Sequence, residues 1–223
     1  MPSPASSRLI VLHLTKHSDS SVVLHTVDSL GGRRSFLVRG LKANRGALAS
    51  FHSLSLLDVV SSDSPRSSLS YLREWTPAVA LHGIRSDLVK GSVAMFVSEV
   101  IYRSLTNEVA DQQLFDWLCD AVVTLDEETG SIANYPLWFL VSYAGRMGFL
   151  PGDPIEPPGI FTPAESDLLF RVVRSSYAET LAIPLSAERR QAFCRKMLQY
   201  LSYHLGATID AKSLDVLHAV LAE

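Results

Sequence analysis

The chain has 223 residues, of which 47% are hydrophobic and 19% are charged, a balance that excludes a globally disordered protein. The formal net charge of -3 hides an asymmetry, because residues 1–80 carry nine Lys and Arg against five Asp and Glu, whereas residues 81–223 carry 11 against 18. No stretch approaches the roughly 18 consecutive apolar residues of a membrane-spanning helix, and the polar start lacks the pattern of a secretory signal.

The first 76 residues are predicted to form a small all-β module. Short β-branched and apolar runs alternate with polar turns, and the adjacent glycines Gly31 and Gly32 supply the positive φ of a tight hairpin. The predicted strands cover residues 8–14, 22–27, 35–39, 54–60 and 69–75. Five short strands without helical periodicity between most of them favour a closed, five-stranded OB-type barrel.

After Pro77 the apolar period changes to about 3.6 residues, which predicts helices. The predicted helices cover residues 82–105, 111–125, 134–149, 165–177, 186–205 and 213–221. Thr162, Pro163 and Glu165 form the pattern of a capping box with proline at the first helical position. The predicted fold is therefore α+β and multidomain. Residues 1–78 form a basic OB-type β-barrel, and residues 79–223 form an acidic helical bundle with a proline-rich loop at 150–162.

Signatures of catalysis and of metal binding are missing from the sequence. The phosphate-binding loop, the nucleophile elbow, the zinc-protease motif and the dinucleotide fingerprint do not occur. Cys119 and Cys194 have no C-x-x-C partner, which argues against a disulfide framework or a zinc knuckle. The run Asp126-Glu127-Glu128 is more typical of a solvated helix end than of a metal site. We expect a non-enzymatic protein without cofactor or metal, reduced and cytoplasmic.

Five cations fall within 13 residues and form what we call the basic stripe. Its members are Arg33, Arg34, Arg39, Lys42 and Arg45, with Gly40 among them. No acid interrupts the sequence between Asp28 and Asp58, and a basic surface on an OB-type barrel favours a nucleic-acid strand. Phe36 and Phe51 are the only nearby aromatic residues, so phosphate contact is expected to dominate over base stacking. The alternative is an ordinary solvated hairpin and loop.

A second basic cluster lies on the predicted helix at 186–205. It comprises Arg189, Arg190, Arg195 and Lys196. Arg189 and Lys196 are seven residues apart and share a helix face. A solvated helix surface is the more common explanation of such a pattern, and a binding site for an acidic partner is the other.

Four segments, in the same order along the chain, resemble RecO, the bacterial recombination mediator. They are residues 11–24, with a polar turn between two strands, Leu37-Val38-Arg39-Gly40-Leu41-Lys42, Gly148-Phe149-Leu150-Pro151, and Tyr203-His204-Leu205-Gly206 followed by Lys212-Ser213-Leu214.

The resemblance implies an N-terminal OB-fold and a helical domain. It also implies binding of single- and double-stranded DNA, annealing of complementary strands and loading of RecA onto strands coated by single-strand-binding protein (SSB). The implied partners are RecR and the acidic C-terminal tail of SSB, with RecF and RecA involved indirectly at the bacterial nucleoid. Arg39, Gly40 and Lys42 inherit the DNA contact from the family signature, whereas Arg33, Arg34 and Arg45 are added from local charge.

One segment departs from the family pattern. Many RecO proteins carry a four-cysteine zinc module after the position of Pro151, but residues 152–162 contain no cysteine. The chain therefore resembles the shorter branch of the family, and zinc is not expected. The rival hypotheses are a protein-interaction scaffold, in which the barrel is a docking module, and a nucleic-acid-processing enzyme.

Overall fold

The computed structural model describes residues 5–30, 32–40, 47–62, 69–106, 111–152 and 155–221. The chain divides into two compact units. The first comprises Met1–His82 and Leu105–Val123, and the second comprises Gly83–Ser104 and Thr124–Glu223. The predicted domain boundary after residue 78 stays a prediction.

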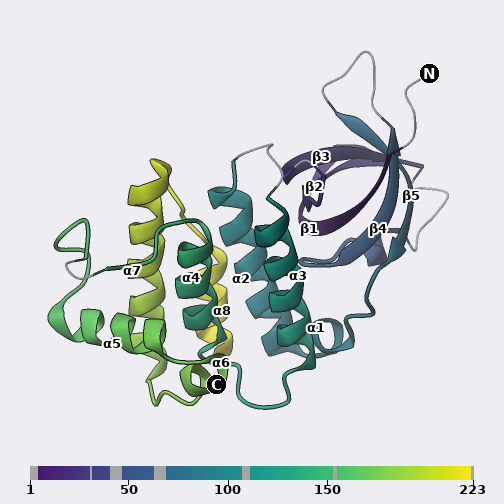
Figure 1. Cartoon of the computed structure of the whole chain (residues 1–223). Coiled ribbons are helices and arrows are strands. Elements are labelled where there is room, and N and C mark those ends of the chain that lie inside the picture. Colours follow the sequence, from purple (N-terminus) through teal and green to yellow (C-terminus); the bar gives the residue numbers. More distant parts are fainter. Residues whose placement is uncertain are drawn as a thin grey trace. The chain divides into compact units, whose positions relative to one another are not determined.

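The first unit contains a closed five-stranded barrel (Figure 1). Its strands are β1 (Ala5–Ser18), β2 (Ser21–Asp28), β3 (Gly32–Arg39), β4 (Leu56–Ser62) and β5 (Ser70–Pro77). Around the barrel the order is β1-β2-β3-β5-β4, and every neighbouring pair is antiparallel except β3 and β5, which run parallel. This arrangement confirms the predicted OB-type barrel.

The barrel interior is filled by alternate residues of the strands, as the period of two requires. The buried cluster consists of Leu9, Val11, Leu24, Phe36, Val38, Phe51, Leu57, Val59 and Leu72. β1 extends to Ser18, four residues beyond the predicted end of this strand at Leu14. Lys16 pairs with Val22, and register shifts in β1 let this long strand curve around the barrel. Gly32 adopts a φ of 62°, as the predicted tight turn between β2 and β3 requires.

After β5, the described part of the chain folds into helices joined by loops. They are α1 (His82–Ser86), α2 (Leu88–Ser104), α3 (Gln112–Glu127), α4 (Tyr135–Arg146), α5 (Pro163–Arg174), α6 (Tyr177–Leu181), α7 (Ala187–Leu205) and α8 (Ser213–Leu221). The single helix predicted at 82–105 is two helices, because the Asp87 carboxylate accepts hydrogen bonds from the backbone amides of Val89 and Lys90 and starts a new helix. The predicted capping box at Thr162 and Glu165 is confirmed.

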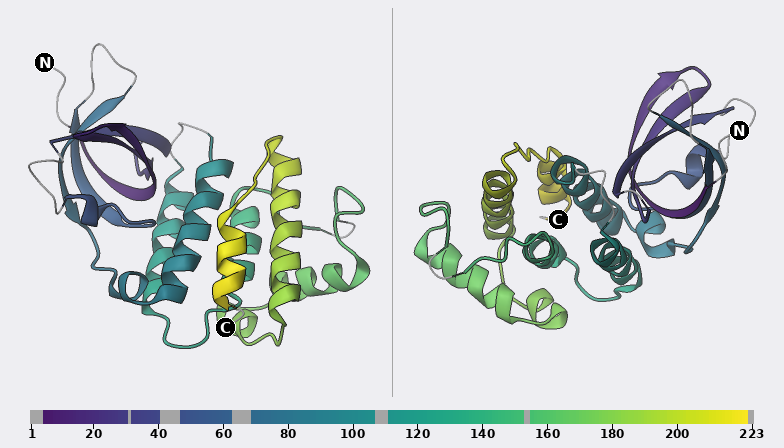
Figure 2. Two further views of the ribbon diagram at one scale, coloured as in Figure 1. Left: turned by 180° about the vertical axis from the view of Figure 1, so that it is seen from behind. Right: turned by 45° about the horizontal axis from the view of Figure 1, so that its top comes forward.

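The second unit is held together around α4, which is buried on most sides. Tyr135, Phe139 and Tyr143 stack along its length, and the Tyr143 hydroxyl lies 2.8 Å from Ser104 Oγ of α2. Figure 2 shows α8 between α2 and α7, with the three helices running side by side, whereas α5 runs at a steep angle to them on the far side of α7. The amide of Asn134, just before α4, donates to the carbonyl oxygens of Thr180, Leu181 and Ile183 and so fastens the end of α6.

Glu99 of α2 caps the N-terminus of α8. Its Oε2 accepts hydrogen bonds from the backbone amide and hydroxyl of Ser213, at 2.9 and 2.6 Å, and its Oε1 pairs with Arg103. Burial opposes the charge of this carboxylate, but the hydrogen bonds from Ser213 and the charge of Arg103 outweigh it and lower the pKa of Glu99 below its usual 4.5.

Glu99→Gln is expected to remove an acid-sensitive part of the stability. A carboxyl whose pKa is lowered on folding stabilises the protein above its unfolded pKa and loses this effect as the pH falls through the folded value. Between neutral pH and about pH 3, the thermal midpoint of the variant should therefore fall less than that of the wild type. The matched control is Asp210→Asn, a change at an exposed carboxylate. An equal fall for Glu99→Gln and the wild type would contradict the prediction.

Candidate nucleic-acid interface

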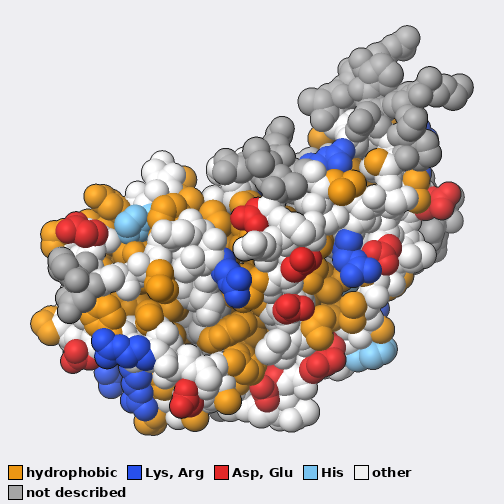
Figure 3. Space-filling view, viewed as in Figure 1, with side chains coloured by type: hydrophobic (Ala, Val, Ile, Leu, Met, Phe, Trp, Pro, Cys, Tyr) orange, Lys and Arg blue, Asp and Glu red, His pale blue; other side chains and the backbone are white. Residues whose placement is uncertain are grey.

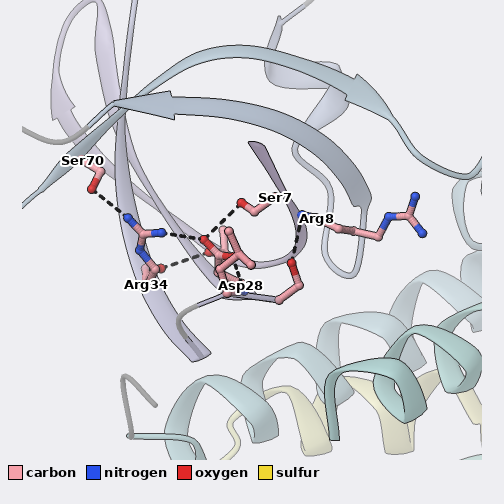
Figure 4. A network of polar contacts seen from close by, with 8 residues as sticks. Ser7, Arg8, Asp28, Arg34 and Ser70 are labelled. Atoms are coloured by element: carbon pink, nitrogen blue, oxygen red, sulfur yellow. Dashed lines mark hydrogen bonds and ion pairs between the residues drawn. The ribbon is translucent and has the colours of Figure 1, made fainter. Parts of the chain in front are cut away.

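Arg34 of the basic stripe lies on the inner side of its strand, in a polar network at one end of the barrel (Figure 4). Its guanidinium pairs with the buried carboxylate of Asp28 at 2.9 Å and donates to Ser70 Oγ at 3.1 Å. Asp28 also accepts from Ser7 Oγ and from the backbone amide of Leu30. The network joins β1, β2, β3 and β5, so the charge of Arg34 is largely neutralised by Asp28.

Arg33 and Arg34 point to opposite sides of β3. Arg33 donates to the backbone carbonyl of Leu105, within the same compact unit, at 3.3 Å. Beside Arg33 on the outer side, His25 lies between Thr15 and Ser35, with a hydroxyl at 3.0 and 2.8 Å from its two ring nitrogens. Burial, followed by electrostatic interaction with His13 and Arg33, lowers the pKa of His25. The ring is therefore neutral at physiological pH and adds no cation to this face.

Arg39 lies on the outer side of β3 and is exposed. Its Cζ lies 4.6 Å from the centroid of the Tyr71 ring on β5, and its Nη2 donates to the Tyr71 hydroxyl at 3.2 Å. Arg73 approaches the same ring at 5.5 Å and donates from its Nε to Ser62 Oγ at 2.8 Å. We call Arg39, Tyr71 and Arg73 the arginine–tyrosine cluster.

The two phenylalanines near the basic stripe are unavailable for stacking on a ligand, since Phe36 and Phe51 are 0% and 4% exposed. Tyr71 instead brings an aromatic ring to Arg39 from a strand 32 residues further along the chain. Sequence reasoning missed both Tyr71 and Arg73. The spacing of two residues on a predicted strand was a signal that they share a face, but nothing in the sequence paired that strand with β3 in parallel.

Of the remaining members of the stripe, the structure describes Gly40. Gly40 follows the strand with a φ of 78°, a backbone conformation that glycine adopts without strain. Lys42 and Arg45 lie outside the described residues. Their contact with DNA stays a prediction, as it does for every member of the stripe.

The four members of the second basic cluster do not share one side of α7. Arg189 is exposed and Lys196 is half-buried one heptad further along the same face. Arg195 pairs with Asp215 of α8 at 2.6 Å, and Arg190 donates to the carbonyl of Leu185 at 2.7 Å. Arg195 and Arg190 therefore make contacts within the second unit, which we call the helical unit. Arg189 and Lys196 form no ion pair with any residue that the structure describes.

Catalytic chemistry has little support in the described part of the chain. Within it, no three His, Cys, Asp or Glu side chains gather in a way that could hold a metal ion. Burial raises the pKa of the Cys119 and Cys194 thiols to about 12, so neither is a thiolate at neutral pH. The described helices include none with the length and apolar character that crossing a membrane requires.

Acidic side chains are scattered over the face of the helical unit seen in Figure 3, and basic side chains gather over α5. The last turn of α5 carries Arg171 and Arg174, and both are exposed. The guanidinium of Arg174 lies 5.7 Å from the centroid of the Phe170 ring on the same helix. Pairing of an arginine with an aromatic ring therefore also occurs away from the barrel.

The chain therefore belongs to the class of proteins in which a small OB-type barrel precedes an all-helical region. Residues 85–152 match the family model described as Recombination protein O C terminal. Relatives named DNA repair protein RecO from Flavobacterium psychrophilum, Bacteroides fragilis and Porphyromonas gingivalis are 25%, 28% and 29% identical to this chain. The alignments cover 97%, 93% and 95% of this chain and 98%, 95% and 96% of the relatives. The chain is therefore similar to RecO proteins over almost its whole length.

Arg34→Ala is expected to destabilise the protein by about 2–3 kcal/mol, because it leaves the buried Asp28 carboxylate without its charged partner. This figure is below the cost of breaking a fully buried pair, since the Arg34 side chain is 26% exposed. Arg39→Ala removes only exposed contacts and should cost about 0.5–1 kcal/mol. Urea denaturation of both variants measures the difference, and equal losses would contradict it.

Proposed function

We propose that this protein is a non-enzymatic recombination mediator that binds single- and double-stranded DNA, anneals complementary strands and, with RecR, helps to load RecA onto SSB-coated strands. The observation that carries the proposal is the exposed pair of guanidinium groups, Arg39 and Arg73, on the OB-type barrel of a RecO-family chain. The site of action would be the cytoplasm, at the nucleoid.

Charge neutralisation is the physical basis of the proposed activity. Each guanidinium that meets a phosphate releases counterions from the strand, which favours binding most at low salt. Two strands held on one basic surface repel each other less, so complementary sequences meet and pair faster. No covalent step is needed, in keeping with names of the relatives that denote repair proteins rather than enzymes.

The helical unit is proposed to bind the protein partners. The exposed Arg189 and the half-buried Lys196 on α7 suit the acidic tail of SSB, and the same surface is the candidate for a second DNA contact. RecR would be the direct partner, and RecF and RecA would take part indirectly.

Arg39→Ala combined with Lys42→Ala is expected to weaken binding to labelled oligonucleotides, both single-stranded and duplex, in fluorescence anisotropy. The logarithm of affinity should fall linearly with the logarithm of salt concentration, with a slope of about -0.7 for each phosphate contacted on a single strand, and the variant should have a shallower slope. Arg174→Ala is the matched control, because this exposed arginine lies in the helical unit.

A wild-type protein that binds no DNA even at low salt would overturn the proposal. Binding that ignores the double substitution would favour the rival hypothesis, in which the barrel docks onto an acidic protein. Nuclease activity that requires a metal and remains through purification would revive the enzyme hypothesis.

Arg189→Glu combined with Lys196→Glu is expected to weaken binding of a peptide with the acidic, hydrophobic-ended sequence of an SSB tail by at least about tenfold, since both changes replace attraction by repulsion. Isothermal titration calorimetry measures the loss. Arg171→Glu provides the same reversal of charge on α5 and should leave the affinity within about twofold. An unchanged affinity for the double variant would rule out this surface as the tail site.

A further inference from the structure

Tyr71 is held by two arginines on the outer side of the short parallel seam between β3 and β5. The seam contains two register pairs, Phe36 with Ser70 and Leu37 with Tyr71. Phe36 faces the interior, so Leu37 and Tyr71 face outward, and the Tyr71 ring is partly exposed. The two guanidinium groups reach this ring from different strands, Arg39 from β3 and Arg73 from β5.

We infer that the arginine–tyrosine cluster is a stacking site for one unpaired nucleotide, in which the Tyr71 ring receives the base and Arg39 and Arg73 bind the flanking phosphates. The inference rests on the proposed DNA binding and names the place on the barrel where a single strand differs from a duplex. The ligand class is single-stranded nucleic acid of any sequence, because every base has a π-face.

The charge of the cluster favours an anionic ligand. Two guanidinium groups within 5.5 Å of one ring centroid repel each other. Neither Arg39 nor Arg73 forms an ion pair with any residue in the described ranges. Glu74, the neighbour of Arg73 in β5, lines a separate pocket together with Asp58, Trp75 and Thr76. A phosphate close to the two arginines would relieve their repulsion.

The contacts within the free cluster are weak enough to be exchanged. A guanidinium over an exposed tyrosine contributes less than a nucleobase stacked on the same ring. A base can therefore displace one arginine from the ring, and the displaced guanidinium keeps its donors for the phosphate that accompanies the base. Arg73 Nε donates to Ser62 Oγ, and the terminal nitrogens of the same side chain donate to no acceptor among the described residues.

The cluster would also discriminate between the two forms of DNA. In a duplex the faces of the bases are stacked on one another and cannot reach a protein ring without unstacking, whereas the phosphates remain accessible. Tyr71 should therefore contribute to binding of single strands alone, and the two arginines should contribute to both forms.

The test compares three tyrosine variants by fluorescence anisotropy with an oligothymidylate and with a duplex of equal length. Tyr71→Leu is expected to lower single-strand affinity about tenfold and to leave duplex affinity within about twofold. Tyr71→Phe keeps the ring but loses the acceptor of the Arg39 hydrogen bond, and should remain within about threefold of the wild type. Tyr203→Leu is the matched control, since this tyrosine is 59% exposed on α7 in the helical unit.

Equal loss of both affinities in Tyr71→Leu, or no loss in either, overturns the stacking site. A failure of the proposed function looks different, because the wild-type protein would then bind neither form of DNA. If Tyr71→Leu does not fold, photo-crosslinking of the wild-type protein to an oligonucleotide containing 5-iodouracil decides the matter. A crosslink at Tyr71, located by mass spectrometry, supports the inference, and crosslinks confined to other residues overturn it.

Discussion

Closure of the barrel at the parallel seam between β3 and β5 is the constraint on which the first unit depends. The seam has only two register pairs, whereas β2 and β3 share eight. Side chains supplement the short backbone ladder on both sides. Arg34 joins Asp28 to Ser70 at the barrel end, and Arg39 joins β3 to Tyr71 on the outer side. Two arginines from one strand thus bridge the position where an open sheet would present two edges.

Near the same seam, one arginine of β3 stabilises the barrel and another is exposed and accessible to a ligand. Because side chains alternate along a strand, Arg34 points toward the buried carboxylate of Asp28 while Arg39 stays exposed. A loss of DNA binding in an Arg34 variant would therefore be difficult to separate from a loss of stability. Arg39 and Arg73 are better suited to probe function, since their contacts are exposed and individually weak.

The helical unit follows a different principle, in which a few buried polar groups set the arrangement of apolar helices. Glu99 caps α8 from α2, and Asn134 gathers three carbonyl oxygens at the end of α6. These contacts use the Asn134 amide nitrogen and the Glu99 carboxylate within the helical unit. The face of α7 with Arg189 and Lys196 is the proposed binding site for the SSB tail.

The sequence by itself determined the class of fold, the positions of most strands and helices, and the similarity to RecO proteins. Periodicities of two and 3.6 residues are local properties, and the capping box at Thr162 and Glu165 follows from neighbouring residues alone. The tertiary structure decided which arginine of β3 pairs with a carboxylate and which one meets an aromatic ring. Strand order and register are non-local, so only the folded barrel pairs Arg34 with Asp28 and brings Tyr71 to Arg39 across 32 residues of chain. The basic stripe is one continuous feature of the sequence. In the folded barrel the alternation of side chains along β3 turns Arg34 toward the interior, where it pairs with Asp28, and leaves Arg39 exposed on the outer side.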